Sequence, residues 1–284
     1  VLDTISEPQE ETDFPALSPD GTQVAVTAKT GKNIDIWIHN IQDKTKKRLT
    51  NHEALDHFPA WAPSGKYIAF SSTRNDIGGI FIRQSDGRRA ARQLISSEAA
   101  WAPFWGRNNF MVYQYFSAET QGDLMFIRPW TNTTQRPLIT SPSFEATPVL
   151  SPNIRYVAYT SDKTGRPEVY VTRFPRPGKE WQISQNGGAL PRWSSQSKEL
   201  IFVETTGAND TSPKLMSVSV QTDPSFRYQT PQPLFELNNV GSATAIGNYD
   251  VSGDGQFFVI VQSIDEIPTV NIRIAENWHN EFKE

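Results

Sequence analysis

The sequence predicts an all-β protein, a six-bladed β-propeller made of four-stranded antiparallel blades. Three observations support this fold class. A strand–turn–strand phrase recurs about every 44 residues, two short strands follow each copy, and the chain begins with the strand that the last copy lacks. Self-similarity with a period of about 40 to 45 residues is typical of propeller blades. We therefore expect a single propeller domain over residues 1–284, with six repeats of four strands.

The repeated phrase is clearest at residues 58–72, where Phe-Pro-Ala-Trp-Ala-Pro-Ser-Gly leads into Tyr-Ile-Ala-Phe-Ser-Ser. Proline fixes φ at the first turn position and glycine provides the conformational freedom that the corner needs, so the phrase predicts a β-hairpin. The third copy has a degraded turn, and an insertion displaces the sixth. The other copies occupy residues 14–26, 102–115, 146–161, 190–203 and 249–261.

Two more strands follow each hairpin. An alternating run predicts the third strand of each blade, over residues 34–38, 79–83, 123–128, 168–172, 215–220 and 270–274. A short run that centres on Leu or Ile predicts the fourth strand, over residues 48–50, 93–95, 137–139 and 182–184. The sixth copy has no such run after residue 274.

Residues 2–6 provide the missing strand. Ile5 precedes Pro15 by ten residues, just as Leu49 precedes Pro59. We expect residues 1–6 to complete blade six and close the ring, which leaves no free sheet edge between the first and last blades. In the tail, residues 275–284, Trp278 and Phe282 are four apart, which predicts one or two helical turns packed on the ring.

Composition excludes several classes of function. The 27 basic and 31 acidic residues give a net charge of −4, too balanced for binding to nucleic acid or an anionic membrane. The absence of cysteine excludes disulfides, thiolate metal sites and a cysteine nucleophile, and fits either the cytosol or a bacterial periplasm. No run approaches 18 apolar residues. Because the first residue is Val1, we expect a mature form or an excised domain.

The motifs resemble a known family. Ser-Pro-Asp-Gly at residues 18–21, Val-Ala-Val at 24–26 and Asp-Ile-Trp-Ile at 35–38 resemble the TolB-like six-bladed propeller repeat of bacterial proteins. WD-dipeptide repeats match less well, because no copy has the Gly-His and Trp-Asp marks. Related propellers also occur in prolyl oligopeptidases, whose hydrolase domain this sequence lacks, and in some polysaccharide lyases.

The resemblance covers residues 1 to about 275 and implies a function in binding. TolB itself binds a lipoprotein at one mouth of its ring, in the periplasm. Similar propellers form the C-terminal part of membrane-anchored transcriptional regulators and Ser/Thr kinases, and those chains end much like residues 277–283. The resemblance therefore implies an extracytoplasmic sensor or scaffold domain that another part of its chain can anchor to a membrane. A free periplasmic protein remains the alternative.

Polar residues that precede each inner strand are expected to line one mouth of the central channel. They are Asp13, Asp56, His57, Glu98, Glu145, Asn186 and Asn248, with Asp250 inside the sixth copy. We expect no organic cofactor. Converging carboxylates could hold Ca²⁺ through oxygen ligands, and the alternative is a water-filled channel with a polar lining.

Other chemistry has weak support. His52, His57 and Asp56 could provide part of a zinc site, although exposed loop histidines are the simpler interpretation. No Gly-x-Ser-x-Gly elbow and no glycine-rich phosphate loop is present, so nucleophilic catalysis and nucleotide binding are not predicted.

Aromatic residues that we expect to be exposed are a stronger lead. Trp101, Phe104 and Trp105 lie where the third copy departs from the consensus, and such breaks are expected at functional sites. The alternative is that they fill space left by lost turn residues. We therefore expect a non-enzymatic propeller that binds a protein, peptide or glycan-derived ligand at one mouth. The rival hypothesis is a metal-assisted hydrolase or lyase that acts on carbohydrate.

Overall fold

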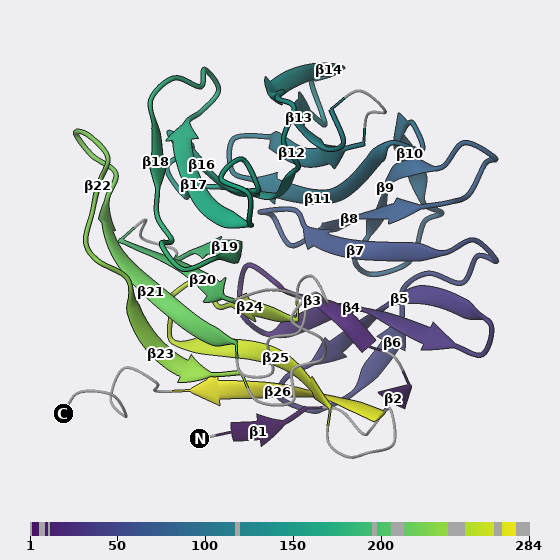
Figure 1. Ribbon diagram of the computed structural model, residues 1–284. Coiled ribbons are helices and arrows are strands. Elements are labelled where there is room, and N and C mark those ends of the chain that lie inside the picture. The colour runs from purple at the N-terminus through teal and green to yellow at the C-terminus, as the bar shows by residue number, and fades with distance from the viewer. Residues whose placement is uncertain are drawn as a thin grey trace. The chain divides into compact units, whose positions relative to one another are not determined.

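The computed structural model describes residues 2–5, 9–10, 12–116, 120–194, 198–205, 213–237, 248–263 and 269–276. All regular secondary structure in these ranges is β-strand, and the strands form six antiparallel sheets (Figure 1). The predicted fold class is confirmed in the described ranges: the strands form the six antiparallel four-stranded blades expected of a six-bladed propeller, and two of the blades carry one further short strand. The chain also divides into two compact units, each described below by itself.

The first unit comprises Val1–Trp105, Asn239–Gly241 and Ala245–Glu284. Blade one has the order β3 (Thr12–Leu17), β4 (Gln23–Thr30), β5 (Asn33–Asn40) and β6 (Lys46–Arg48). Blade two has the order β7 (Asp56–Trp61), β8 (Tyr67–Ser72), β9 (Gly79–Gln84) and β10 (Arg92–Ser96). Blade six has the order β24 (Tyr249–Val251), β25 (Phe257–Ser263), β26 (Thr269–Glu276) and β1 (Leu2–Thr4), and β2 (Gln9–Glu10) also pairs with β26.

The second unit comprises Gly106–Asn238 and Ser242–Thr244. The sheet of blade three has the order β11 (Ala100–Gly106), β12 (Phe110–Tyr115), β13 (Asp123–Arg128) and β14 (Asn132–Ile139). Blade four has β15 (Glu145–Leu150), β16 (Tyr156–Ser161), β17 (Glu168–Arg173) and β18 (Glu180–Gln182). Blade five has β19 (Ala189–Trp193), β20 (Glu199–Glu204), β21 (Lys214–Gln221) and β22 (Arg227–Tyr228), and β23 (Gln232–Glu236) also pairs with β21.

The N-terminal strand completes blade six, as the sequence predicts (Figure 1). Leu2 pairs with Ala275 and Thr4 with Arg273, and the N–H of Ile5 donates to the carbonyl of Ile272 at 3.0 Å. Residue 6 and the tail over residues 277–284 lie outside the described residues, so the helical turns expected there stay a prediction. Residues 275 and 276 belong to β26.

A serine hydroxyl forms hydrogen bonds across the turn of the repeated hairpin. In three blades the hydroxyl of a buried serine accepts a backbone N–H five residues ahead and donates to the side chain two residues ahead. The three are Ser18 with Gln23 and Asp20, Ser151 with Tyr156 and Asn153, and Ser252 with Phe257 and Asp254. Satisfying a buried N–H in this way explains these serines structurally.

The core of the first unit consists of apolar side chains from neighbouring blades. One cluster joins blades six and one and contains Ile5, Val24, Val26, Val259 and Ile272. A second cluster joins blades one and two through residues that include Ile36, Trp61, Phe70 and Phe81. Burial of these faces against each other explains why the sequence alternates along each strand.

Candidate functional site

The first strand of five of the six blades carries a backbone feature that the sequence marks with a proline. In five blades the residue before this proline has a φ between 46° and 60°, in the left-handed region. These residues are Phe14, Phe58, Ala102, Thr147 and Leu190. In β3, β7, β15 and β19 the register of the pairing shifts at this point, as in a β-bulge. Bulges redirect side chains and occur often beside functional sites.

The amide of the bulge residue ties its strand to the preceding blade. In three cases it donates to a Ser or Thr hydroxyl on the second strand of that blade. The three hydroxyl residues occupy the same register position in their blades. The bonds are Phe58 to Thr27 at 3.2 Å, Ala102 to Ser71 at 3.1 Å and Leu190 to Thr160 at 3.2 Å. In blade three the residue at this register position is Gln114, which pairs with Leu124 as Ser71 pairs with Ile80, so this bond has no Ser or Thr acceptor there.

Four aromatic rings from blades one, two and three lie in series at these strand starts. The ring centroids of Phe14 and Phe58 are 4.2 Å apart, and Trp101 meets Phe58 edge-on at 6.1 Å. The His57 ring lies 5.9 Å from Phe58 and 6.3 Å from Trp101. All four side chains are partly exposed. We call Phe14, His57, Phe58 and Trp101 the aromatic step.

A hydrogen bond positions one of these rings, and burial sets the charge state of another. The indole N–H of Trp101 donates to the carbonyl of Glu98 at 2.6 Å, which fixes the ring against the chain. Burial lowers the pKa of His57, and the neighbouring Asp56 carboxylate opposes this effect. The imidazole is therefore neutral at pH 7 and can stack or accept a hydrogen bond.

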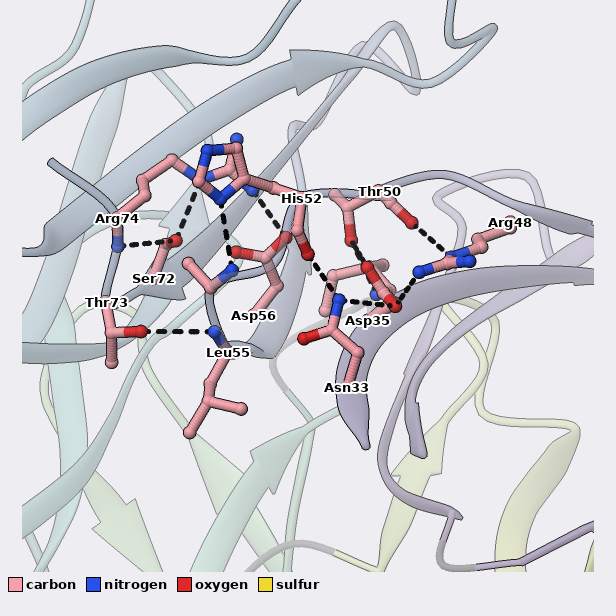
Figure 2. A network of polar contacts seen from close by, with 12 residues as sticks. Asn33, Asp35, Arg48, Thr50, His52, Leu55, Asp56, Ser72, Thr73 and Arg74 are labelled. Atoms are coloured by element: carbon pink, nitrogen blue, oxygen red, sulfur yellow. Dashed lines mark hydrogen bonds and ion pairs between the residues drawn. The ribbon is translucent and has the colours of Figure 1, made fainter. Parts of the chain in front are cut away.

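A buried ion pair lies next to the aromatic step. Arg74 Nη2 contacts Asp56 Oδ2 at 2.5 Å, and Arg74 Nε donates to the hydroxyl of Ser72 at 2.9 Å (Figure 2). The guanidinium also lies over the rings of Phe70 and Phe81, 5.4 and 5.1 Å from their centroids. Asp56 is thus fully buried and paired. It fixes the start of β7 and is not presented to solvent.

Asp35, near the start of β5 in blade one, has a similar network (Figure 2). Arg48 Nη2 contacts Asp35 Oδ2, and the hydroxyl of Thr50 donates to Asp35 Oδ1 at 3.2 Å while it accepts the N–H of Ile36 at 2.9 Å. Burial raises the pKa of Asp35, although Arg48 acts in the opposite direction. Blade four repeats the arrangement with Glu168 and Ser184.

The predicted histidine site takes part in the same network. His52 Nδ1 accepts the N–H of Ala54 at 3.1 Å, and its backbone carbonyl accepts the side-chain amide of Asn33 (Figure 2). No group of three or more His, Cys, Asp or Glu residues suited to a metal ion exists among the described residues. With Asp56 engaged by Arg74, the local geometry does not favour a zinc site at His52 and His57.

The remaining predicted residues differ in their surroundings. In the first unit, Asp13 and Asp250 are partly exposed, Glu98 is exposed and Asn248 is buried. Asp250 Oδ2 accepts the N–H of Leu17 at 2.8 Å, which joins blades six and one. In the second unit, Asn186 is exposed and Glu145 is buried.

The three predicted aromatic residues differ in their exposure to solvent. Trp101 and Phe104 are partly exposed, whereas Trp105 is only 5% exposed, so the expectation that Trp105 is an exposed aromatic was wrong. At the equivalent position in blades two and five, the indole of Trp61 donates to Ala16 and that of Trp193 to Val149. This position therefore packs blade against blade.

Sequence reasoning missed Phe14 and Phe58, which complete the aromatic step. The available signal was an X-Pro dipeptide at a fixed place in five repeats. Proline disfavours the right-handed helical region for the residue before it, which is compatible with the observed backbone but does not identify its left-handed φ.

Comparison with known proteins places the chain in a family. A family model described as the TolB β-propeller domain matches residues 2–159, more than half of the chain. The chain belongs to the TolB β-propeller domain family. The predicted resemblance is therefore confirmed.

Curated relatives share part of the chain. A TolB homologue from Chlorobium luteolum is 28% identical over 127 residues, which is 44% of this chain and 28% of that protein. The Tol-Pal system protein TolB from Anaeromyxobacter dehalogenans is 27% identical over 92 residues, 32% of this chain and 21% of that protein. The match thus spans less than a third of the length of either relative.

Solved structures show the same fold. A TolB-type protein from Agrobacterium tumefaciens superposes with a TM-score of 0.72 at 16% identity, over 93% of this chain and 90% of that one. Oligogalacturonate lyase in complex with manganese superposes with a TM-score of 0.63 at 10% identity, over 94% and 76%. At such identities the likeness concerns the fold alone. Among the described residues, no helix is long and apolar enough to cross a membrane.

Proposed function

We propose that this propeller is a non-enzymatic binding domain that holds a peptide segment of a protein partner on the aromatic step. The observation that carries the proposal is the series of four partly exposed rings at the bulged strand starts of blades one to three. Aromatic anchors, tryptophan above all, contribute most of the binding energy in many protein interfaces.

The geometry suits a peptide for two reasons. Phe58 and Trp101 lie on strands whose bulge amides are bonded to the neighbouring blade, so little side-chain freedom would be lost on binding. Glu98 is exposed, and its carbonyl accepts the indole N–H of Trp101. Its carboxylate therefore provides a negative charge near the aromatic step that a basic group in the ligand could meet.

The relatives support a binding function. Those named above include a protein of the Tol-Pal system, which suggests by analogy that this chain also has a protein partner. By the same analogy we place the protein outside the bacterial cytoplasm, as a sensor or scaffold domain. Cell fractionation of the tagged full-length protein tests this location, and recovery in the cytosol would contradict it.

The binding test uses a random peptide library displayed on phage and selected on the purified protein. Isothermal titration then compares the enriched peptides on three variants. Trp101→Ala should weaken binding at least about tenfold, because a central aromatic anchor is lost. Trp130→Ala is the matched control, since Trp130 is 49% exposed and lies outside the aromatic step. It should bind as the unchanged protein does.

The proposal fails if the peptides bind Trp101→Ala and Phe58→Ala as tightly as the unchanged protein. Equal losses in Trp101→Ala and Trp130→Ala would indicate a general effect on the fold. A glycan array provides the alternative ligand class. Binding to a glycan that Trp101→Ala abolishes, without any enriched peptide, would keep the site and replace the partner.

A further inference from the structure

Two pairs of buried carboxylates occupy equivalent places in the repeat. In each pair one residue begins the third strand of a blade or lies near its start, and the other begins the first strand of the next blade. Asp35 and Asp56 form the first pair, and Asp123 and Glu145 form the second. All four side chains are buried, with Asp123 7% and Glu145 1% exposed.

The first pair is neutralised from within the chain. Arg48 contacts Asp35, and Arg74 contacts Asp56. Oδ1 of Asp56 has no hydrogen-bond partner among the described residues, so one unbonded oxygen is not by itself the mark of a site. What distinguishes the first pair is that each carboxylate has its own guanidinium.

The second pair has neither guanidinium. Arg48 lies opposite Trp37 across β5 and β6, and at the same place in blade three Pro137 lies opposite Met125. Arg74 follows Asp56 by 18 residues, and Lys163 follows Glu145 by the same interval. Lys163 points elsewhere, however.

The ammonium of Lys163 is engaged by blade four. Its Nζ contacts Glu180 Oε2 at 2.6 Å and lies 3.6 Å from the ring centroid of Tyr170. Of the two positions that neutralise the first pair, one therefore carries no charge in the second pair and the other pairs with a different acid.

Neutral donors satisfy only half of the second pair. Asp123 Oδ2 accepts the hydroxyl of Thr120 at 2.7 Å, and Glu145 Oε1 accepts the hydroxyls of Ser141 and Ser161 at 2.7 and 3.1 Å. Asp123 Oδ1 and Glu145 Oε2 are buried and have no hydrogen-bond partner among the described residues.

The two carboxylates are close enough to act on each other. The N–H of Glu145 donates to the carbonyl of Gly122 at 3.0 Å, and Gly122 and Phe144 form a β-bridge. Burial raises the pKa of Glu145, and the charge of Asp123 acts in the same direction, whereas the hydroxyls of Ser141 and Ser161 and the charge of Lys163 oppose the rise. Two like charges that are buried together are disfavoured unless a counter-charge lies against them, and the ammonium of Lys163 contacts Glu180 instead.

We propose that Asp123 and Glu145 bind a divalent cation of the Ca²⁺ type, which takes the place of the two guanidinium groups of the first pair. The free carboxylate oxygens provide its negative ligands. The hydroxyls of Thr120, Ser141 and Ser161 keep lone pairs that can complete an oxygen-rich shell, which a hard cation prefers. This site is independent of the aromatic step and of the proposed peptide.

The test measures binding of the metal alone. Isothermal titration of CaCl₂ into chelator-treated full-length protein should show one site per chain, and Ca²⁺ should raise the melting temperature. Glu145→Gln and Asp123→Asn should each weaken Ca²⁺ binding at least tenfold. Asp86→Asn removes an exposed carboxylate and should leave the affinity unchanged.

A compensating variant distinguishes loss of the metal site from loss of the fold. Pro137→Arg restores the guanidinium that blade one has at Arg48, so it should abolish Ca²⁺ binding and raise the melting temperature without metal. The proposal is overturned if neither Ca²⁺, Mg²⁺ nor Mn²⁺ binds or shifts the melting temperature of the unchanged protein. It is also overturned if Ca²⁺ binding survives in both Glu145→Gln and Asp123→Asn, or in Pro137→Arg. If the melting temperature does not change with metals but falls as the pH rises from 5 to 8, Asp123 and Glu145 share a proton and the proposal is also overturned.

Discussion

At the scale of single residues, His39 is the most perturbed histidine in the described part of the chain. It lies in β5 opposite Lys46, is fully buried, and neither ring nitrogen has a hydrogen-bond partner there. Burial lowers the pKa of His39 to about 4, and the charge of Lys46 acts in the same direction. The folded protein therefore holds this side chain neutral, while the unfolded chain takes up a proton below about pH 6.5.

We predict that His39 makes the protein less stable in mild acid. Because the unfolded state binds more protons below pH 6.5, the free energy of unfolding should fall as the pH drops from 7 to 5, by about 2 kcal/mol from this residue. Urea unfolding at the two pH values measures the change. His39→Leu cannot be protonated, so it should show a smaller drop than the unchanged protein. An equal drop in both proteins would assign the pH dependence to other groups.

At the scale of secondary-structure elements, the bulge of each first strand is the feature that joins one blade to the next. Thr160 of β16 illustrates it, because its hydroxyl accepts the N–H of Leu190 at 3.2 Å and lies 2.9 Å from the hydroxyl of Thr147. One buried hydroxyl thus contacts the bulge residues of both blades four and five.

Replacement of Thr160 by valine tests the contribution of this contact. Valine keeps the shape but removes the acceptor, so we expect a loss of about 1 to 3 kcal/mol in the free energy of unfolding. Thr134→Val makes the same chemical change on the exposed strand β14 and should alter stability by less than about 0.5 kcal/mol. Denaturant unfolding compares the two variants. If they lose equal amounts, the hydroxyl does not tie the bulges together.

The sequence predicts elements better than it predicts local backbone geometry. The third strand expected over residues 123–128 matches β13 residue for residue, because a strand buried on both faces has a clear apolar pattern. The bulges were not predicted, since a left-handed φ leaves no trace in an alternating pattern. The outer strand of blade five was not predicted either. It consists of two pieces, β22 and β23, which pair with β21 on the same side.

The same contrast applies to the candidate site. Trp101 and His57 were found because they interrupt the repeat or precede a strand, and the structure brings their rings within 6.3 Å of each other. Phe14 and Phe58 were read as ordinary strand residues, because hydrophobicity does not report on which side of a bulge a ring emerges. The burial of Asp56 depends on Arg74, 18 residues away, and no local pattern predicts that pair.

At the scale of the whole molecule, the fold depends on the return of the chain to its own beginning. The sheet of blade six has its fourth position filled by β1, from the other end of the chain. Ile5, just after this strand, is buried in the cluster that joins blades six and one. With β1 in place, the edge of β26 is paired within the chain and is not open to other molecules.

Loss of the Ile5 side chain should therefore weaken the closure. Ile5→Ala leaves a cavity among Val24, Val259 and Ile272 and should cost about 2 to 5 kcal/mol in the free energy of unfolding. Ile77→Ala is the matched control, because Ile77 is 55% exposed and should contribute less than about 1 kcal/mol. Thermal unfolding followed by light scattering should also show that Ile5→Ala aggregates at a lower temperature, since a frayed β1 exposes the edge of β26. Equal stability of the two variants would mean that the chain ends do not hold this blade together.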